Sequence, residues 1–251
     1  MKRINHTIHR PMNILLLSDI HGNFPALAAI EDAVRGLEFS HVLNCGDCTV
    51  YAPFANETMA WLRQHRAISI RGNTDDRILR LLTGKSFKKP ANPEKRCMYT
   101  STFAALESAA QKDLLALRKK ESLNVSSRRI GLYHGSPEDH EEFLFNDTPD
   151  KRFAALAKTC GQDIVITGHS HSPYHKYIGG VHFINPGSVG RMFDGDPRTS
   201  FAVLELGEDK DAIQVRHHRL DYDIEKVAAE LKRQNLPDIY AEMFRQGRKL
   251  N

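Results

Sequence analysis

The chain contains 251 residues, of which 41% are hydrophobic and 26% are charged, a composition typical of soluble globular proteins. No apolar run approaches the roughly 18 residues of a membrane span, and the short apolar run near the N-terminus does not resemble a signal peptide, so we expect a cytoplasmic protein without a membrane partner. The net charge of +4 mildly favours an anionic substrate, but no long basic stripe interleaved with aromatic residues indicates a nucleic-acid partner.

Short apolar strands alternate with amphipathic helices in the first third of the chain, which predicts α/β layering. We expect strands at 13–19, 41–47 and 67–73, and helices at 24–37, 53–65 and 75–82. Residues 84–100 interrupt this alternation with two prolines and five basic residues. This segment is predicted to be either a lid over a functional site or a solvated connector, and the connector is favoured.

Helices are expected at about 102–119, 150–159 and 223–247. From residue 122 onward the predicted strands are shorter and antiparallel in character. No composition change marks a linker. We therefore predict one domain over residues 12–251, with C-terminal helices from about 223, and an N-terminal extension at 1–11 that leaves Met12 as an alternative start.

Five predicted strands end in the same chemistry, namely a carboxylate, amide or imidazole beside a glycine that lets the backbone turn. In layered α/β folds, ligand sites gather at the carboxyl ends of strands. This agreement argues that the His pair in "GHSH" binds a ligand instead of lying in an ordinary surface turn. The strand-end residues are Asp19, His21, Asp47, Asn73, His134, His169 and His171.

These seven side chains are too many for one tetrahedral zinc ion, and two ions that share a carboxylate fit the number better. Mixed oxygen and imidazole ligands suit Mn²⁺, which we expect, with iron, zinc, nickel or cobalt as alternatives. Two ions about 3.5 to 4 Å apart can bind a phosphoryl oxygen jointly and lower the pKa of a bridging water, which then attacks phosphorus. The predicted reaction is hydrolysis of a phosphate ester.

The order Asp-x-His, Gly-Asp, Gly-Asn-x-Asp, His-Gly and Gly-His-x-His resembles the calcineurin-like metallophosphoesterase superfamily. The resemblance covers about residues 12–220 and is greatest to its small prokaryotic phosphodiesterase branch, which is related to diadenosine tetraphosphatases and Ser/Thr phosphatase-like proteins. "YAPFANETMAWLR" and "NPGSVGRMFDGDPRTSFAVLEL" look like that branch in particular. The resemblance implies a four-layer α/β/β/α sandwich of two mixed sheets flanked by helices.

The resemblance also implies a role for each strand-end residue. The first metal would be held by Asp19, His21 and His171, and the second by Asn73, His134 and His169, with Asp47 bridging the two ions. Asp47, Asn73 and His134 are the predicted catalytic residues, and a hydroxide bound to the metals is the predicted nucleophile.

One position departs from the family pattern. Many members carry Gly-Asn-His-Asp/Glu at the third motif, where the histidine is thought to protonate the leaving group, but this chain has Thr74 there. A threonine hydroxyl cannot act as a general acid near neutral pH, because its pKa is far too high. We therefore expect phosphodiesters or substrates with good leaving groups. The alternative functions are hydrolysis of a dinucleoside polyphosphate, a Ser/Thr protein phosphatase-like activity, and a non-catalytic metal-binding scaffold of the same fold. The expected partner is a small, nucleotide-derived phosphoester.

Substrate-binding residues are less well defined by the sequence. Asn23 either binds the phosphate or caps the helix that follows it, and Arg191 either binds the phosphate or, like Arg198, pairs with an acidic residue at the surface. Asp75 either braces the Asn73 loop or caps a helix, and Tyr51 either stacks on a nucleobase or packs in the core. "CGDC" has the spacing of a redox or zinc pair, although no second pair completes a zinc set.

Overall fold

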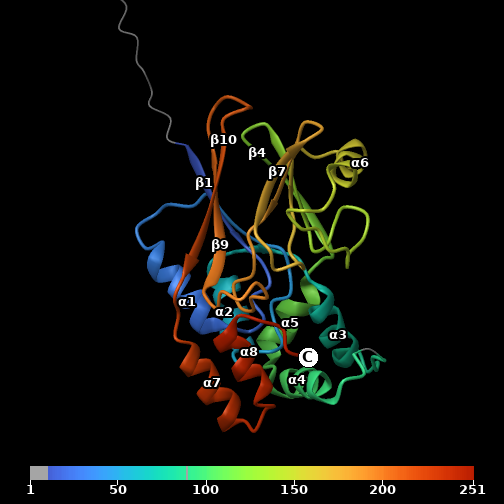
Figure 1. The fold of residues 1–251 in the computed structure, drawn as a ribbon, viewed down its shortest axis with the longest axis vertical. Coiled ribbons are helices and arrows are strands. Elements are labelled where there is room, and N and C mark those ends of the chain that lie inside the picture. The colour runs from blue at the N-terminus through green and yellow to red at the C-terminus, as the bar shows by residue number, and fades with distance from the viewer. Residues whose placement is uncertain (1–10, 89) are drawn as a thin grey trace, which may run out of the picture.

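The computed structural model describes residues 11–88 and 90–251, so residues 1–10 of the predicted extension lie outside the described part of the chain. Two five-stranded sheets form the centre of the molecule (Figure 1). The first sheet has the order β10 (Ile213–Leu220), β9 (Thr199–Leu206), β1 (Met12–Leu17), β2 (His41–Asn44) and β3 (Ile68–Ser69). The second has the order β4 (Lys120–Val125), β5 (Arg128–Tyr133), β6 (Ile164–Ile166), β8 (Val181–Asn185) and β7 (Tyr174–Ile178).

Helices cover the outer faces of both sheets (Figure 1). Most of the helices pack on the outer face of the first sheet, and α6 packs beside β7 of the second sheet. None of the helices in the described part of the chain combines the length and apolar character needed to cross a membrane. The helices are α1 (Phe24–Ala33), α2 (Ala55–Gln64), α3 (Asn73–Leu82), α4 (Pro93–Ala105), α5 (Ser108–Ala116), α6 (Asp150–Cys160), α7 (Ile224–Arg233) and α8 (Ile239–Gln246).

The burial of β1 shows why the fold has four layers. Its side chains alternate between two apolar clusters, as expected for a strand buried on both faces. Ile14 and Leu16 lie in the core between the two sheets, together with Ile166 of the second sheet. Leu15 lies in the core beneath the helices, together with Leu27 of α1.

The second sheet has a smaller apolar cluster on its outer face, where Phe153 of α6 packs edge-on against Phe183 of β8 at a centroid distance of 5.1 Å. The molecule thus has four successive layers: helices, the first sheet, the second sheet and a further helix. The predicted α/β/β/α sandwich of two mixed sheets is confirmed.

Several predicted elements differ from the observed ones. The strands after residue 122 are not all antiparallel, because β5 pairs with β6 and β6 with β8 in parallel. Helix α6 lies between β5 and β6 in the chain and provides the crossover that a parallel pair requires. Half of the 84–100 segment is also helical, since Asn92 caps α4 by accepting a 3.0 Å bond from the Lys95 N–H, and Pro93 follows as the first helical residue.

The loops that follow the parallel strands approach one another closely at one end of the sandwich. A Cβ atom added to Gly168, after β6, would lie 1.9 Å from Ser18 Oγ and 2.8 Å from Asp19 Oδ2, after β1. A Cβ atom at Gly72, after β3, would lie 2.1 Å from Asp47 Oδ1, after β2. Only glycine permits these contacts, and they bring the strand ends of both sheets into one site.

Candidate metal centre

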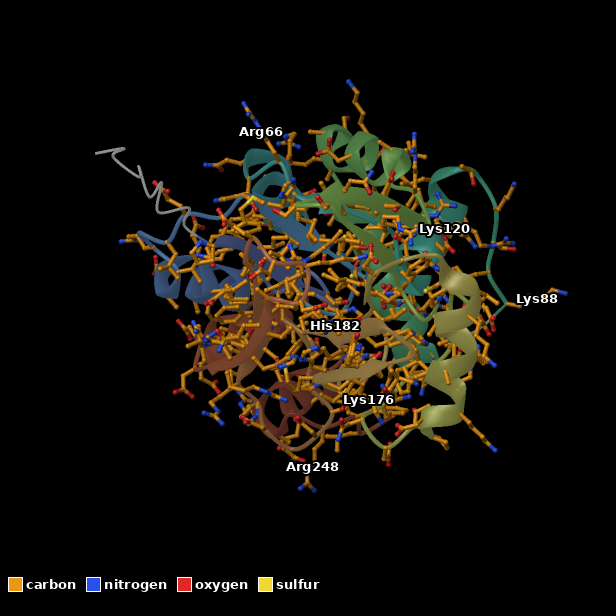
Figure 2. All side chains as sticks on the ribbon, turned by 90° about the horizontal axis from the view of Figure 1, so that it is seen from above. Arg66, Lys88, Lys120, Lys176, His182 and Arg248 are labelled. Atoms are coloured by element: carbon orange, nitrogen blue, oxygen red, sulfur yellow. The ribbon has the colours of Figure 1, made fainter. Side chains whose placement is uncertain are left out.

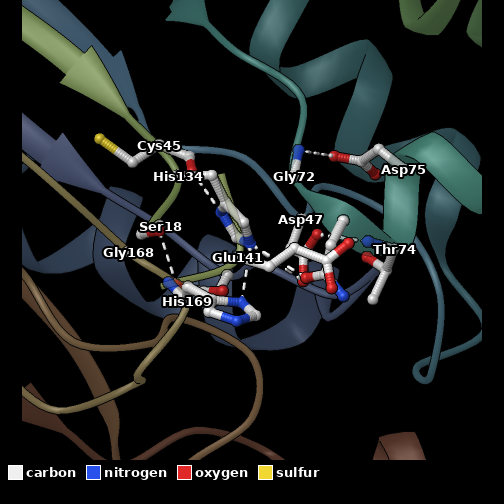
Figure 3. A network of polar contacts seen from close by, with 12 residues as sticks. Ser18, Cys45, Asp47, Gly72, Thr74, Asp75, His134, Glu141, Gly168 and His169 are labelled. Carbon is white, nitrogen blue, oxygen red and sulfur yellow. Dashed lines mark hydrogen bonds and ion pairs between the residues drawn. The ribbon is translucent and has the colours of Figure 1, made fainter. Parts of the chain in front are cut away.

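All seven predicted ligands lie together at this end of the sandwich, and Figure 3 shows part of the cluster. Six of them are buried, and Asn73 is partly buried. Within the described residues, Asp19, His21 and His171 each place one ligand atom within 4.8 Å of the others, and so do Asp19, Asp47 and His134. The structure therefore brings together every strand-end residue that the sequence singled out.

Five of these residues have a left-handed backbone, which is uncommon for residues other than glycine and costs of order 1–3 kcal/mol each. Hydrogen bonds between neighbouring loops hold this conformation: the Asp19 N–H donates to Gly46 O at 2.9 Å, and the His21 N–H to Asp47 O at 2.8 Å. Strain of this kind is concentrated at functional sites. The φ angles are 52° at Asp19, 53° at His21, 53° at Asp47, 63° at His169 and 56° at His171.

The first group of ligands is centred on Asp19. Its Oδ2 accepts hydrogen bonds from Ser18 Oγ at 2.6 Å and from the His169 N–H at 3.0 Å. Its Oδ1 is buried without a hydrogen-bond partner among the described residues, and it lies 3.3 Å from His171 Nε2 and 4.0 Å from His21 Nε2. An unpaired buried carboxylate oxygen facing two imidazole nitrogens is what a cation site requires.

Asp47 connects the two groups. Its Oδ1 accepts a 2.8 Å bond from the Thr74 N–H, which is visible in Figure 3. Its Oδ2 lies 3.8 Å from His21 Nε2 in the first group and 3.6 Å from His134 Nε2 in the second. Asp19 also lies near both groups, but Asp47 Oδ2 is the oxygen positioned between their histidines.

The second group contains Asn73, His134 and His169. His134 Nδ1 must carry the proton, since its 2.8 Å partner is the carbonyl of Cys45, and Nε2 is therefore an acceptor. That nitrogen lies 3.1 Å from Asn73 Oδ1 and 3.1 Å from His169 Nδ1. With the Asn73 amide turned over, its nitrogen donates to His134 Nε2 at 3.1 Å and to His169 Nδ1 at 3.2 Å. In either orientation the amide and two imidazole nitrogens converge on one point, where a cation could be held through Asn73 Oδ1 and the two nitrogens.

The charge states of the cluster suit metal binding, which requires neutral imidazoles and ionised carboxylates. Burial, followed by the neighbouring His171, holds the pKa of His21 well below its usual value. Burial, followed by His134, lowers the pKa of His169 to about 3. Burial alone would raise the pKa of Asp19, but His171 and the other histidines lower it overall. The donor set and its charges therefore fit divalent cations with mixed nitrogen and oxygen ligands.

His134 differs from the other histidines because its pKa is raised. Burial acts to lower it, but the carboxylates of Asp47 and Asp19 and the hydrogen bond to Cys45 outweigh burial. A cation at the second group would compete with this proton for Nε2, so we expect metal affinity to fall at acid pH.

Asp75 performs both roles that the sequence allowed. It is fully buried and accepts hydrogen bonds from the N–H groups of Cys48, Thr49 and Gly72 at 3.0–3.2 Å, as well as from the Thr49 hydroxyl at 2.9 Å. Burial and the nearby Asp47 raise its pKa to about 6. It caps α3 and also fixes the loop after Asp47 against the loop that carries Asn73.

The two arginines of the 190–198 loop behave differently. Arg198 is exposed and pairs with Asp196 at 2.7 Å, as the surface alternative proposed. Arg191 is only 6% exposed and has no carboxylate partner among the described residues; its guanidinium lies 3.9 Å from the centroid of Tyr51. Its backbone carbonyl accepts a hydrogen bond from His171 Nδ1. A buried cation next to a ligand histidine is poised to bind an anion.

Asn23 and Tyr51 have the structural roles that the sequence left open. Asn23 is fully buried, its Oδ1 caps α1 by accepting from the Ala26 N–H at 3.2 Å, and its Nδ2 donates to Gly190 O at 3.0 Å. Tyr51 is 6% exposed and packs edge-on against the ring of His21. Capping accounts for the position of Asn23 and packing for that of Tyr51.

The redox interpretation of "CGDC" does not agree with the structure. Cys45 and Cys48 are fully buried free thiols, and burial raises the pKa of each. A reactive cysteine needs a lowered pKa and access to solvent. Both side chains are part of the packing around Asp47.

Sequence reasoning missed the aromatic residues at the rim of the centre. The ring of Phe143, which is 55% exposed, stacks on His169 at 4.1 Å, and the ring of Phe193 stacks on His171 at 4.2 Å. Neither residue follows a predicted strand end, so the strand-end rule could not find them. A further pocket beside Asn73 was also missed, since three separate segments line it.

The sequence profile of the calcineurin-like phosphoesterase superfamily domain matches residues 12–209. An uncharacterized protein of Methanocaldococcus jannaschii is 27% identical over 252 aligned positions, which cover 94% of this chain and 98% of that protein. A "probable metallophosphoesterase" of Methanothermobacter thermautotrophicus is 35% identical over 95 positions, covering 37% of this chain and 49% of that protein.

Two solved structures have the same fold over nearly the whole chain. The metallophosphoesterase of Sphaerobacter thermophilus is 25% identical, with a TM-score of 0.78, and the match covers 94% of this chain and 99% of that one. A hypothetical protein of Pyrococcus horikoshii OT3 is 18% identical, with a TM-score of 0.82, covering 95% of this chain and 99% of that one. The resemblance to the superfamily that the sequence motifs indicated is thus confirmed.

Proposed function

Because the chain belongs to the calcineurin-like phosphoesterase superfamily and is a metal-dependent phosphoester hydrolase, we propose that it binds two divalent ions and acts preferentially on phosphodiesters. The first ion would be held by Asp19, His21 and His171, and the second by Asn73, His134 and His169. Asp47 would be shared between them.

The position of Asp47 Oδ2 is the observation that carries this proposal. It lies within 3.8 Å of one histidine from each group, while Oδ1 is held by the Thr74 N–H. One carboxylate can therefore serve both groups without moving. Two bound ions would polarise the phosphoryl oxygens and lower the pKa of a water between them. We expect Mn²⁺, with iron, zinc, nickel or cobalt as alternatives, since the donor set accepts all of them.

Arg191 supplies the positive charge that the histidine groups do not. Its guanidinium is packed among aromatic rings, at 3.9 Å from Tyr51, 5.1 Å from Phe193 and 5.6 Å from Tyr240. The rings fix its position, and the low dielectric strengthens its attraction for an anion. We assign it to the non-bridging oxygens of the substrate, whose negative charge it would stabilise as the nucleophile adds to phosphorus.

Thr74 supports the preference for diesters. Its hydroxyl is buried and has no hydrogen-bond partner among the described residues, so it neither donates a proton nor relays one from a neighbour. A poor leaving group needs protonation as it departs, whereas an aryloxide or similarly stable anion does not. Substrates with good leaving groups therefore suit this centre.

The test compares an aryl phosphate monoester with bis(p-nitrophenyl) phosphate, each assayed with added Mn²⁺ and with Asp47→Ala as the blank. Faster hydrolysis of the diester, abolished in the variant, is the expected result. Faster hydrolysis of the monoester would contradict the diester preference. Metal analysis of the same samples should give about two ions per wild-type chain, and one ion per chain would contradict the shared role of Asp47.

A further inference from the structure

A pocket of about 420 Å³ opens directly beside Asn73. Its size is within the usual range for small-molecule sites. Three segments of the chain build it: the loop after β2, helix α3, and the 84–100 segment with the start of α4. The lining residues are Tyr51, Asn73, Arg77, Pro90, Ala91, Lys95 and Tyr99.

The 84–100 segment forms a fixed wall of this pocket. Arg96 Nη1 donates to the carbonyls of Phe87 at 3.0 Å and Pro90 at 3.3 Å, and Arg80 Nε donates to Ser86 O at 2.9 Å. The ring of Phe87 is buried and packs against a pocket tyrosine. Apart from residue 89, which lies outside the described residues, the segment is thus neither an unattached connector nor a free lid.

The charged groups on the pocket are positive. Arg77 donates to the backbone carbonyl of Asn73 at 2.8 Å and lies 3.8 Å from Glu141, which offsets part of its charge. Lys95 has no carboxylate within 4.0 Å among the described residues. Glu94, its neighbour in the chain, instead accepts a bond from Asn251 at the C-terminus.

Further cations surround Lys95. The pKa of Lys95 is lowered, first by partial burial and then by the charges of Lys249 and Arg191. The C-terminus ends beside α4 (Figure 1), where Asn251 donates to Glu94. Several positive charges thus gather next to the metal centre, where an anion would relieve their mutual repulsion.

The aromatic residues of the pocket do not offer a stacking surface. Tyr51 is 6% exposed and Tyr99 is 2% exposed, and their hydroxyls lie 3.2 Å apart. Stacking on a nucleobase requires an open ring face, which neither tyrosine presents. The charged groups that line the pocket are the cations Lys95 and Arg77, and cations recognise anions.

We propose that this pocket binds a second anionic group of the substrate, such as a second phosphate, through Lys95 and Arg77 while the scissile phosphate lies at the metal centre. The inference rests on the proposed function, since it assumes that the scissile phosphodiester binds beside Asn73. The preferred substrates are then phosphodiesters that carry an additional phosphate, and simple diesters are poorer ones.

Two chromogenic esters with the same leaving group test this proposal: thymidine 5′-(p-nitrophenyl phosphate) and its 3′-phosphorylated form. In wild-type protein we expect at least tenfold higher kcat/KM for the 3′-phosphorylated ester. Lys95→Ala should bring the ratio of the two values close to one, and Lys95→Arg should restore it. Lys88→Ala is the matched control, because Lys88 belongs to the same segment but extends into solvent (Figure 2), so it should leave the ratio unchanged.

Binding measurements separate this proposal from the proposed function. Calorimetric titration with thymidine 5′-monophosphate, 5′-diphosphate and 3′,5′-bisphosphate requires no hydrolysis. We expect at least one doubly phosphorylated ligand to bind more tightly than the monophosphate. Loss of this preference in Lys95→Ala, but not in Lys88→Ala, would support the pocket even if bis(p-nitrophenyl) phosphate is not hydrolysed. Equal affinity for all three ligands, or the same preference in Lys95→Ala, would overturn it.

Discussion

The N–H of Thr74 donates a 2.8 Å hydrogen bond to Asp47 Oδ1, so the residue at the position of the missing histidine also orients the carboxylate that lies between His21 and His134. The bond comes from the backbone and survives any substitution except proline. The identity of the side chain at position 74 can therefore be changed while Asp47 stays in place, which allows the role of that side chain to be tested alone.

Replacing Thr74 by His should introduce the proton donor that many family members carry. We expect kcat/KM for an alkyl phosphate ester, whose poor leaving group needs a proton, to rise about 100-fold, the lower end of the range for general acid catalysis, with a smaller effect on bis(p-nitrophenyl) phosphate. Steady-state kinetics on both substrates measure this. Thr74→Val is the control, since the Thr74 hydroxyl has no hydrogen-bond partner among the described residues, and it should leave both rates nearly unchanged. An equal rise on both substrates would argue against a role in protonation.

Arg191→Met should separate function from stability. The variant retains an unbranched side chain among the aromatic rings but removes a buried charge that has no carboxylate partner among the described residues. We expect kcat/KM to fall by about 100-fold, while the unfolding temperature stays the same or rises, because replacing a buried charge by a hydrophobic residue is often neutral or stabilising. A large loss of stability together with activity would show that Arg191 acts mainly in packing.

Asp75→Asn should weaken metal binding without removing a metal ligand. The amide keeps one acceptor oxygen for the loop N–H groups but loses the other and the charge. Asp75 bonds to Cys48 and Gly72, the chain neighbours of Asp47 and Asn73, and so orients both candidate ligands through their loops. Groups that orient metal ligands typically contribute 10- to 100-fold in metal affinity or activity, and we expect a loss at the lower end of that range. Metal titration of the chelator-treated protein measures the change, and added Mn²⁺ should restore most of the activity if the site is only loosened.

The pair His175 and His182, on neighbouring strands, should make stability depend on pH. Their rings are 2.9 Å apart at Nε2 and Nδ1, and burial, followed by His182, lowers the pKa of His175 to about 4. The unfolded chain therefore binds more protons than the folded chain between about pH 6.5 and pH 4. This contribution to stability is complete above pH 6.5 and is lost as the pH falls towards 4.

Denaturant unfolding at pH 7 and pH 5 tests this in wild-type protein and in His175→Gln. Because the His175 side chain is exposed to solvent, screening reduces the effect to at most about 1 kcal/mol. The wild type should lose about that much more stability than the variant between the two pH values. Parallel losses in both proteins would contradict the assignment.

The sequence determined which polar residues meet at one end of the sandwich, because each candidate ligand has a local signal. A β-branched or apolar run followed by glycine and a polar residue marks the end of a buried strand, and Asp19, Asp47 and His134 all follow such runs. Periodicity was also sufficient for α/β layering, since buried strands and amphipathic helices are local patterns, whereas the four-layer α/β/β/α sandwich was implied by the resemblance to the family. It was less reliable for strand direction after residue 122, because direction depends on which strand becomes the neighbour.

Only the tertiary structure distinguished Arg191 from Arg198, although both stand in the same loop. One is enclosed by Tyr51 and Tyr240 from distant parts of the chain, and the other pairs with Asp196 two residues away. The pocket at Lys95 likewise combines three separate segments with charges from the C-terminus. The burial of a side chain and the charge around it depend on all of its neighbours in space, so residue spacing in the sequence cannot reveal them. The strand-end residues can be recognised from the sequence because the pattern that marks each one lies in its own strand.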